Sequence, residues 1–185
     1  MIDENSTLTD VCFEVSGALD RYSITGVLTG GSAATVYAPE VYTSYDADFV
    51  LTSYPERKQL ERALAEIGYV TSTSAGMYGH PRTTYTLDFL SAPLAVGGDY
   101  IHETATLERG ALRLRILTPT DCVRDRLAAF YHWGDYTSLR AAVGVARAHR
   151  YQIDFERLKE WTERKSGPPP SDYGSKYAEF LKRVA

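Results

Sequence analysis

Two short segments constrain the fold most strongly. Residues 24–29 predict an apolar strand that ends at Gly30 and Gly31, and a second predicted strand begins with Asp46 and Asp48. Glycine lets backbone N–H groups converge on an anion, because it has no Cβ. Side chains two positions apart in a strand point to the same face, where two carboxylates can share a divalent cation. A phosphate-binding turn near metal-binding carboxylates is typical of sites for phosphoryl or nucleotidyl transfer.

A short helix is predicted directly after the glycines, over residues 32–37, and Pro39 ends it. A helix N-terminus at this position directs unpaired N–H groups at an anion. Ser32 adds a hydroxyl that either helps to hold phosphate or only caps the helix. Structural alternatives stay open: the glycines can form a simple strand-to-helix turn, and Asp46 and Asp48 can be the polar face of an exposed strand.

Two further strands are predicted over residues 69–75 and 83–90. In the second, Leu87 and its alternate neighbours form an apolar face, and Thr84, Thr86 and Asp88 share the other face. An aspartate inside an apolar strand is costly unless its charge is used. Asp88 is therefore a third candidate carboxylate, and the alternative is that it pairs with an arginine.

The pattern changes after Leu117, where Thr118 and Pro119 give a strong helix-start signal. We predict an α+β fold with two parts: a mixed sheet flanked by helices over residues 1–117, and a helical region over residues 118–185. No apolar run approaches the ~20 residues that cross a bilayer, so no membrane-spanning segment is expected.

Charge is unevenly spread along the chain. Residues 1–104 carry a balance of −9 and residues 105–185 a balance of +5, within a net charge of −4. The acidic part suits a cation and the basic part a polyanion, unless the basic residues are solvated helix faces. Two distant cysteines and an acidic, polar N-terminus favour free thiols in a reducing compartment, and hence a cytoplasmic protein.

The run Gly31-Ser32, thirteen residues, then Asp46-Ala47-Asp48 resembles the signature of the nucleotidyltransferase-fold superfamily, which includes DNA polymerase β-like and minimal nucleotidyltransferases. Asp88 stands where that superfamily has its third carboxylate, and the resemblance covers about residues 9–90. It implies that Mg²⁺ or Mn²⁺ binds to three catalytic carboxylates, those of Asp46, Asp48 and Asp88. It also implies that the triphosphate of an NTP lies on Gly30, Gly31 and Ser32.

The segment from Leu117 to Asp121, followed by Asp125-Arg126-Leu127, is similar to abortive-infection type toxin nucleotidyltransferases. This resemblance implies that Asp125 and Arg126 border the nucleotide, with Arg126 in place of a lysine that is frequent in those toxins. It further implies an acceptor hydroxyl on RNA, such as a tRNA 3′ end, or on a protein, and an antitoxin partner. A small-molecule acceptor stays open, as in antibiotic-modifying relatives.

The predicted activity is metal-dependent transfer of an NMP from an NTP to an acceptor hydroxyl. The alternative is a non-catalytic nucleotide- or RNA-binding protein on the same fold, since fold does not determine function. A nucleic-acid-binding module without chemistry is the third hypothesis, and it rests on the basic C-terminal part.

Overall fold

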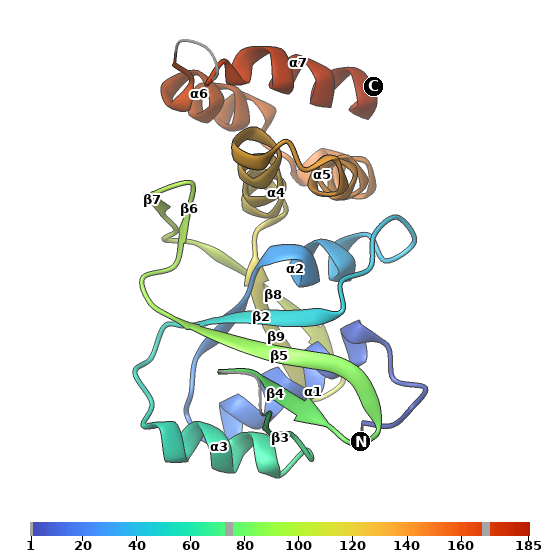
Figure 1. Ribbon diagram of the computed structural model, residues 1–185, viewed down its shortest axis with the longest axis vertical. Helices are drawn as coiled ribbons and strands as arrows, with labels where there is room; N and C mark the ends of the chain where they lie inside the picture. Colours follow the sequence, from blue (N-terminus) through green and yellow to red (C-terminus); the bar gives the residue numbers. More distant parts are fainter. Residues whose placement is uncertain (1, 73–75, 168–170) are drawn as a thin grey trace.

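The computed structural model describes residues 2–72, 76–167 and 171–185 (Figure 1). Within them, seven strands form the main sheet: β1 (Gly26–Leu28), β2 (Asp46–Leu51), β3 (Val70–Thr71), β4 (Tyr78–His80), β5 (Thr83–Ser91), β8 (Thr104–Arg109) and β9 (Leu112–Leu117). Their order is β3-β4-β5-β2-β1-β9-β8. The sheet is mixed, because β5 is parallel to β2 and β9 is parallel to β1, whereas the other neighbours are antiparallel.

Helices cover both faces of this sheet (Figure 1). On one face lie α1 (Leu8–Arg21) and α3 (Arg57–Ala65), and on the other lie α2 (Gly30–Tyr37) and α4 (Pro119–Trp133). The remaining helices stack beyond α4: α5 (Tyr136–Ala148), the short 3₁₀ helix η1 (Arg150–Gln152), α6 (Phe155–Lys165) and α7 (Tyr173–Val184). A small hairpin of β6 (Ala95–Val96) and β7 (Asp99–Tyr100) contacts the α4 layer. This arrangement is the α+β fold that the sequence predicts.

The start of α4 follows the signal in the sequence. The hydroxyl of Thr118 accepts a hydrogen bond from the N–H of Asp121 at 3.1 Å, and Pro119 occupies the first helical turn. Gly134 ends the helix in the left-handed region, with φ 66°. One continuous apolar cluster joins residues from Ile2 to Val184. The division into parts at residues 117 and 118 stays a prediction, although β9 ends at Leu117.

Two predicted boundaries differ from the structure. Helix α2 begins at Gly30 and has Thr29 as its N-cap residue, so Ser32 lies inside the first turn and does not cap the helix. Gly30 makes the turn from strand to helix with φ 65°, a value that favours glycine. The second difference concerns residues 69–75, of which only β3 is strand and 73–75 lie outside the described residues; β4 follows in the predicted connection.

No helix in the described part of the chain combines the length and the apolar character that a membrane crossing requires.

Candidate active site

The three candidate carboxylates lie on one face of two neighbouring strands. In the parallel pairing of β2 with β5, Asp48 is directly opposite Asp88 and Asp46 is opposite Thr86. Because strand side chains alternate between faces, the three aspartates share one face of the two strands, and the carboxylate of Asp48 lies against Gly30 of α2, so this is the face that α2 covers. The register places Asp88, the third carboxylate that the sequence predicts, beside the Asp46–Asp48 pair of β2.

The opposite face of the same strands is mainly apolar and fixes their position. Four side chains on it are at most 8% exposed: Ala47, Phe49, Leu51 and Leu87. The ring of Phe49 stacks on Phe89 of β5, with ring centroids 5.8 Å apart. Tight packing on this side holds the backbone that carries the carboxylates.

Gly30 and Gly31 allow the N-terminus of α2 to lie against this acidic face. A Cβ on Gly30 would meet Oδ2 of Asp48 at well under 3.0 Å, so any side chain there would displace the carboxylate. A Cβ on Gly31 would lie 2.8 Å from the hydroxyl oxygen of Tyr42 and 3.1 Å from Oγ of Ser44. A side chain at Gly30 would therefore shift Asp48, and one at Gly31 would shift Tyr42 and Ser44, so both glycines leave room for groups of this face.

The first turn of α2 offers hydrogen-bond donors at this point. The first N–H that bonds within the helix is that of Ala33, which donates to the carbonyl of Thr29 at 3.0 Å. The N–H groups of Gly30, Gly31 and Ser32 precede it, and these are the groups that a helix start leaves without an internal acceptor. Together with the helix dipole they suit an anionic ligand.

Ser32 connects α2 to the acidic strand. Its side chain is fully buried, and its hydroxyl donates to the carbonyl of Thr29 at 2.8 Å. The same hydroxyl accepts from the N–H of Asp48 at 3.1 Å. Since its hydrogen is already used, the hydroxyl positions Asp48, and the backbone N–H is the group of Ser32 that remains for phosphate.

Negative charge accumulates around Asp48. The pKa of Asp48 is raised from 3.8 to about 6, mainly by burial and also by the charges of Asp46 and Asp88, while Arg126 lowers it. The carboxylate of Asp46 accepts a hydrogen bond from Oγ of Ser44 at 2.7 Å. Three carboxylates with one opposing cation leave a surplus of negative charge on this face, which a bound cation would relieve.

Helix α4 brings Asp125 and Arg126 into the same neighbourhood. Arg126 is mostly buried, and it donates to Oδ2 of Asp125 from Nη2 at 2.6 Å and from Nε at 3.0 Å. Its Nη1 reaches Oγ of Ser138 at 3.5 Å. The charge of Arg126 lowers the pKa of Asp48 and that of Asp125 raises it. Both residues that the sequence assigned to the nucleotide border thus lie close enough to act on Asp48.

The donor set fits a hard divalent cation in its chemistry. Asp46, Asp48 and Asp88 offer only oxygen ligands on one face, as Mg²⁺ and Mn²⁺ prefer. Across residues 2–72, 76–167 and 171–185, however, no group of three or more His, Cys, Asp or Glu side chains lies in an arrangement that could hold a metal ion. The three aspartates share a strand face, and the pKa of Asp48 shows that they share negative charge.

A cavity of about 660 Å³ opens beside Asp46. Its lining is Tyr42, Thr43, Ser44, Tyr45, Asp46, Thr84, Thr86, Thr137 and Arg140. The sequence contained one signal for it, because Thr84 and Thr86 share the strand face of Asp88. Thr137 and Arg140 come from α5, and no local pattern indicates that this helix reaches the same cavity as the strands.

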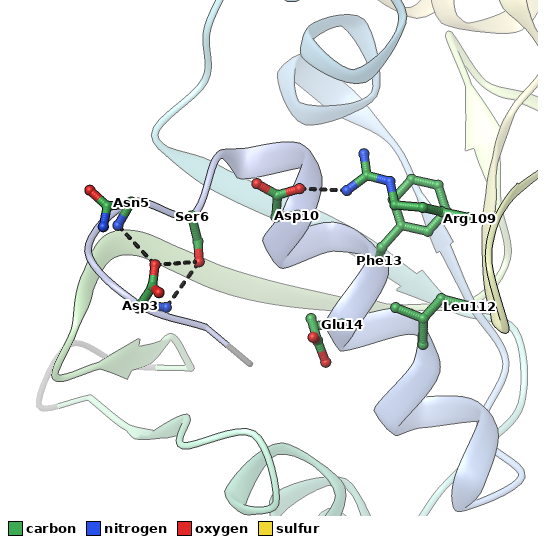
Figure 2. A pocket seen from close by; sticks show the side chains of 8 residues that line it. All are labelled: Asp3, Asn5, Ser6, Asp10, Phe13, Glu14, Arg109 and Leu112. Carbon is green, nitrogen blue, oxygen red and sulfur yellow. Dashed lines mark hydrogen bonds and ion pairs between the residues drawn. The ribbon is translucent and has the colours of Figure 1, made fainter.

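A second cavity, of about 350 Å³, lies away from the carboxylates at the start of α1 and the turn between β8 and β9 (Figure 2). Asp10 forms an ion pair with Arg109 there at 2.5 Å, and the guanidinium of Arg109 lies 4.4 Å from the ring centre of Phe13. Asp3 accepts hydrogen bonds from Asn5 and Ser6 of its own turn. These polar groups bind one another, and none of the candidate site residues lines this cavity.

Comparison with solved structures identifies the fold. The chain superposes on an antigenic nucleotidyltransferase-like protein from Paracoccidioides brasiliensis with a TM-score of 0.60 and 13% identity, over 98% of this chain and 94% of that one. The solution structure of the antibiotic-resistance factor ANT(2'')-Ia gives a TM-score of 0.54 and 14% identity, over 94% and 95% of the two chains. The crystal structure of ANT(2'')-Ia with adenylyl-2''-tobramycin gives 0.50 and 15%, over 97% and 100%.

No family model matches the sequence, and no curated protein matches it. The structural neighbours nevertheless extend over nearly the whole chain, including the C-terminal helices. The protein therefore shares the fold of these structures, which is the fold that the resemblance at its glycines and aspartates implied.

Proposed function

We propose that this protein is a metal-dependent nucleotidyltransferase that transfers an NMP from an NTP to an acceptor hydroxyl. One observation carries the proposal: Asp48 lies opposite Asp88 in the strand register and directly against Gly30 at the start of α2. A cation site and a phosphate site thereby share one carboxylate. The structural neighbours support the reaction class, since they include a nucleotidyltransferase-like protein and an enzyme crystallised with an adenylylated tobramycin.

The three carboxylates would hold the metal, with Asp46 and Asp48 on β2 and Asp88 on β5. When bound, Mg²⁺ or Mn²⁺ neutralises triphosphate charge and lowers the pKa of an acceptor hydroxyl. The backbone N–H groups of Gly30, Gly31 and Ser32 hold phosphate oxygens. Arg126, which Asp125 orients, adds one fixed positive charge beside them.

The reaction follows from this arrangement. The acceptor oxygen attacks the α-phosphorus, and its proton passes to a carboxylate of the site. The bond between the α-phosphorus and the α–β bridging oxygen breaks, and pyrophosphate leaves with that electron pair. No covalent enzyme intermediate is needed, so the protein contributes position and charge.

A non-catalytic nucleotide-binding protein on the same fold is the second candidate. The observation that favours it is that the described carboxylates are not gathered into a metal-binding group. Thermal stability distinguishes the two candidates: a catalytic site is stabilised by Mg²⁺ and NTP together and only slightly by either alone. Stabilisation by NTP in EDTA, equal to that with Mg²⁺, supports the second candidate.

The identity of the acceptor and of any partner belongs to the same proposal. The toxin-type resemblance supports RNA, a tRNA 3′ end or a protein hydroxyl as the acceptor, a cytoplasmic site of action, and an antitoxin partner. Growth arrest by the wild-type protein, and not by an Asp46→Asn variant, is the expected result if the activity is toxic in cells.

The direct test is transfer of label from each α-³²P NTP, with Mg²⁺, Mn²⁺ or EDTA. The acceptors are total tRNA, the protein itself and tobramycin. We expect label on one acceptor with metal and none with EDTA. Absence of transfer to every acceptor would contradict the proposal.

A further inference from the structure

The cavity of about 660 Å³ lies beside Asp46, one of the three candidate carboxylates. Along β5, Asp88, Thr86 and Thr84 lie on one face, and successive members are about 6.6 Å apart, since a strand advances about 3.3 Å per residue. Thr86 is opposite Asp46, and both line the cavity. A molecule in this cavity therefore places one end beside the carboxylates and its other end one or two strand steps away.

The lining of this cavity is rich in hydroxyl groups and has two charged side chains. Apart from the two strand threonines, hydroxyl groups come from the segment after α2 and from Thr137 of α5. The charged groups are Asp46 and Arg140. Because Asp46 belongs to the metal-binding set, Arg140 is the charge that remains to select a substrate.

Arg140 is free to take an external anion. Its side chain is exposed, and it forms no ion pair or hydrogen bond with any residue in the described part of the chain. The guanidinium group has five donors in a planar fork that matches phosphate oxygens. Asp135, the nearest carboxylate in the sequence, is already bound to Ser138 and to the N–H of Thr137.

Another cavity, of about 440 Å³, lies along α5 and is also lined by arginines. Arg140 lines this cavity and the one beside Asp46, and Val143, Gly144 and Arg147 of the same helix line the 440 Å³ cavity. Positions i, i+3, i+4 and i+7 share one helix face, so Arg140 and Arg147 lie on one side of α5, about 10 Å apart along its axis. Arg183 of α7 also lines this cavity and adds a third guanidinium.

We propose that the cavity beside Asp46 is the acceptor subsite, and that it takes an acceptor hydroxyl borne by a phosphate-containing molecule. Arg140 binds that phosphate and is the specificity-determining residue. This inference rests on the proposed transfer activity for the chemical step and adds only the class of acceptor. A polycation such as tobramycin is a poor fit, because Asp46 is the one carboxylate of the lining and it serves the metal.

Two sources can supply this chemistry, a small sugar phosphate or the 3′ end of an RNA, and the probes separate them. Binding is measured by calorimetry without NTP, using ribose 5-phosphate, ribose, an eight-nucleotide RNA and tobramycin. The variants are Arg140→Ala, Arg140→Lys and, as a control, Lys58→Ala. Lys58 is an exposed cation on α3, on the far side of the sheet.

We expect one phosphate-bearing probe to bind at least tenfold more tightly than ribose and tobramycin. Arg140→Ala should weaken that binding at least tenfold, Arg140→Lys should restore part of it, and Lys58→Ala should leave it unchanged. Binding of ribose 5-phosphate identifies the sugar phosphate as the source. Selective binding of the RNA identifies RNA as the source. If Arg147→Ala also weakens RNA binding, the 440 Å³ cavity that Arg147 lines takes part.

Transfer assays separate this inference from the proposed function. If transfer occurs, Arg140→Ala should raise KM for the acceptor and leave KM for the NTP unchanged. Arg140-dependent phosphate binding without any transfer supports the subsite and contradicts the proposed function. Transfer to ribose or tobramycin at wild-type rates in Arg140→Ala supports the function and overturns the subsite.

Discussion

The two faces of strands β2 and β5 differ in almost every property, although they belong to the same backbone. On one face, Asp46, Asp48 and Asp88 place three carboxylates on neighbouring strands, and the pKa of Asp48 is raised. On the other, Phe49 and Leu87 are completely buried among apolar side chains. One face stores unfavourable electrostatic energy, and the other supplies the packing that offsets it.

This comparison shows how a short strand can separate stability from chemistry. The period of two directs alternate residues to opposite sides, so neighbouring positions have independent roles. Substitutions on the apolar face should change the free energy of unfolding, and substitutions on the acidic face should change activity. The following predictions test that separation, from the largest expected effect to the smallest.

Phe49→Ala should produce the largest loss of stability. The substitution removes a fully buried ring, leaves a cavity and abolishes the contact with Phe89. We expect the free energy of unfolding to fall by about 3–5 kcal/mol. Urea unfolding followed by circular dichroism measures the change. Phe49→Leu is the matched control, with a smaller loss of stability and an unchanged transfer rate below its melting temperature. A large loss of activity in folded Phe49→Leu would break the separation of the two faces.

Gly30→Ala tests the contact between α2 and the acidic face. The new Cβ would collide with the carboxylate of Asp48, and a shift of about 1 Å in a catalytic group can reduce the rate about 100-fold. Gly110→Ala is the control: Gly110 also has positive φ, but a Cβ there meets nothing within 4 Å. Both variants should lose about 1 kcal/mol of stability, and only Gly30→Ala should lose transfer activity. Equal activities in the two variants would contradict a role for this contact.

Asp48→Asn should stabilise the metal-free protein. Burial and two neighbouring carboxylates raise the pKa of Asp48 from 3.8 to about 6, so its ionised form opposes folding at neutral pH. Removing the charge should raise the free energy of unfolding by about 1–2 kcal/mol at pH 7.5 in EDTA. Asp20→Asn provides the contrast, because Asp20 pairs with Arg115 at 2.6 Å and its loss should not stabilise. A lower free energy of unfolding for Asp48→Asn would contradict the idea that the charge of Asp48 opposes folding.

Much of this arrangement can be predicted from local sequence. Alternation along one strand places Asp46 and Asp48 together, and the cap at Thr118 marks the start of α4. Local rules succeed for these two features because each depends on residues that are close in the chain. The position of Asp88 opposite Asp48 also needs the parallel pairing of β2 with β5 and its register.

Other features depend on contacts between distant segments. Strand β4 contains Gly79, which has low strand propensity, and it exists because it pairs with β5. The start of α2 at Gly30 depends on the space beside Asp48, and Arg140 of α5 lines the same cavity as Asp46 of β2 and Thr86 of β5. No sequence window contains both partners of these contacts.

The most direct test of the central claim is made on Asp88, the carboxylate supplied by the second strand. Transfer of label from an α-³²P NTP and the free energy of unfolding are measured together for the wild type, Asp88→Asn and, as a surface control, Asp172→Asn. Asp172 caps α7, far from the site. We predict that Asp88→Asn lowers transfer at least 1000-fold without loss of stability, and that Asp172→Asn keeps full transfer. A folded Asp88→Asn with wild-type transfer would contradict the assignment of this strand face as the active site.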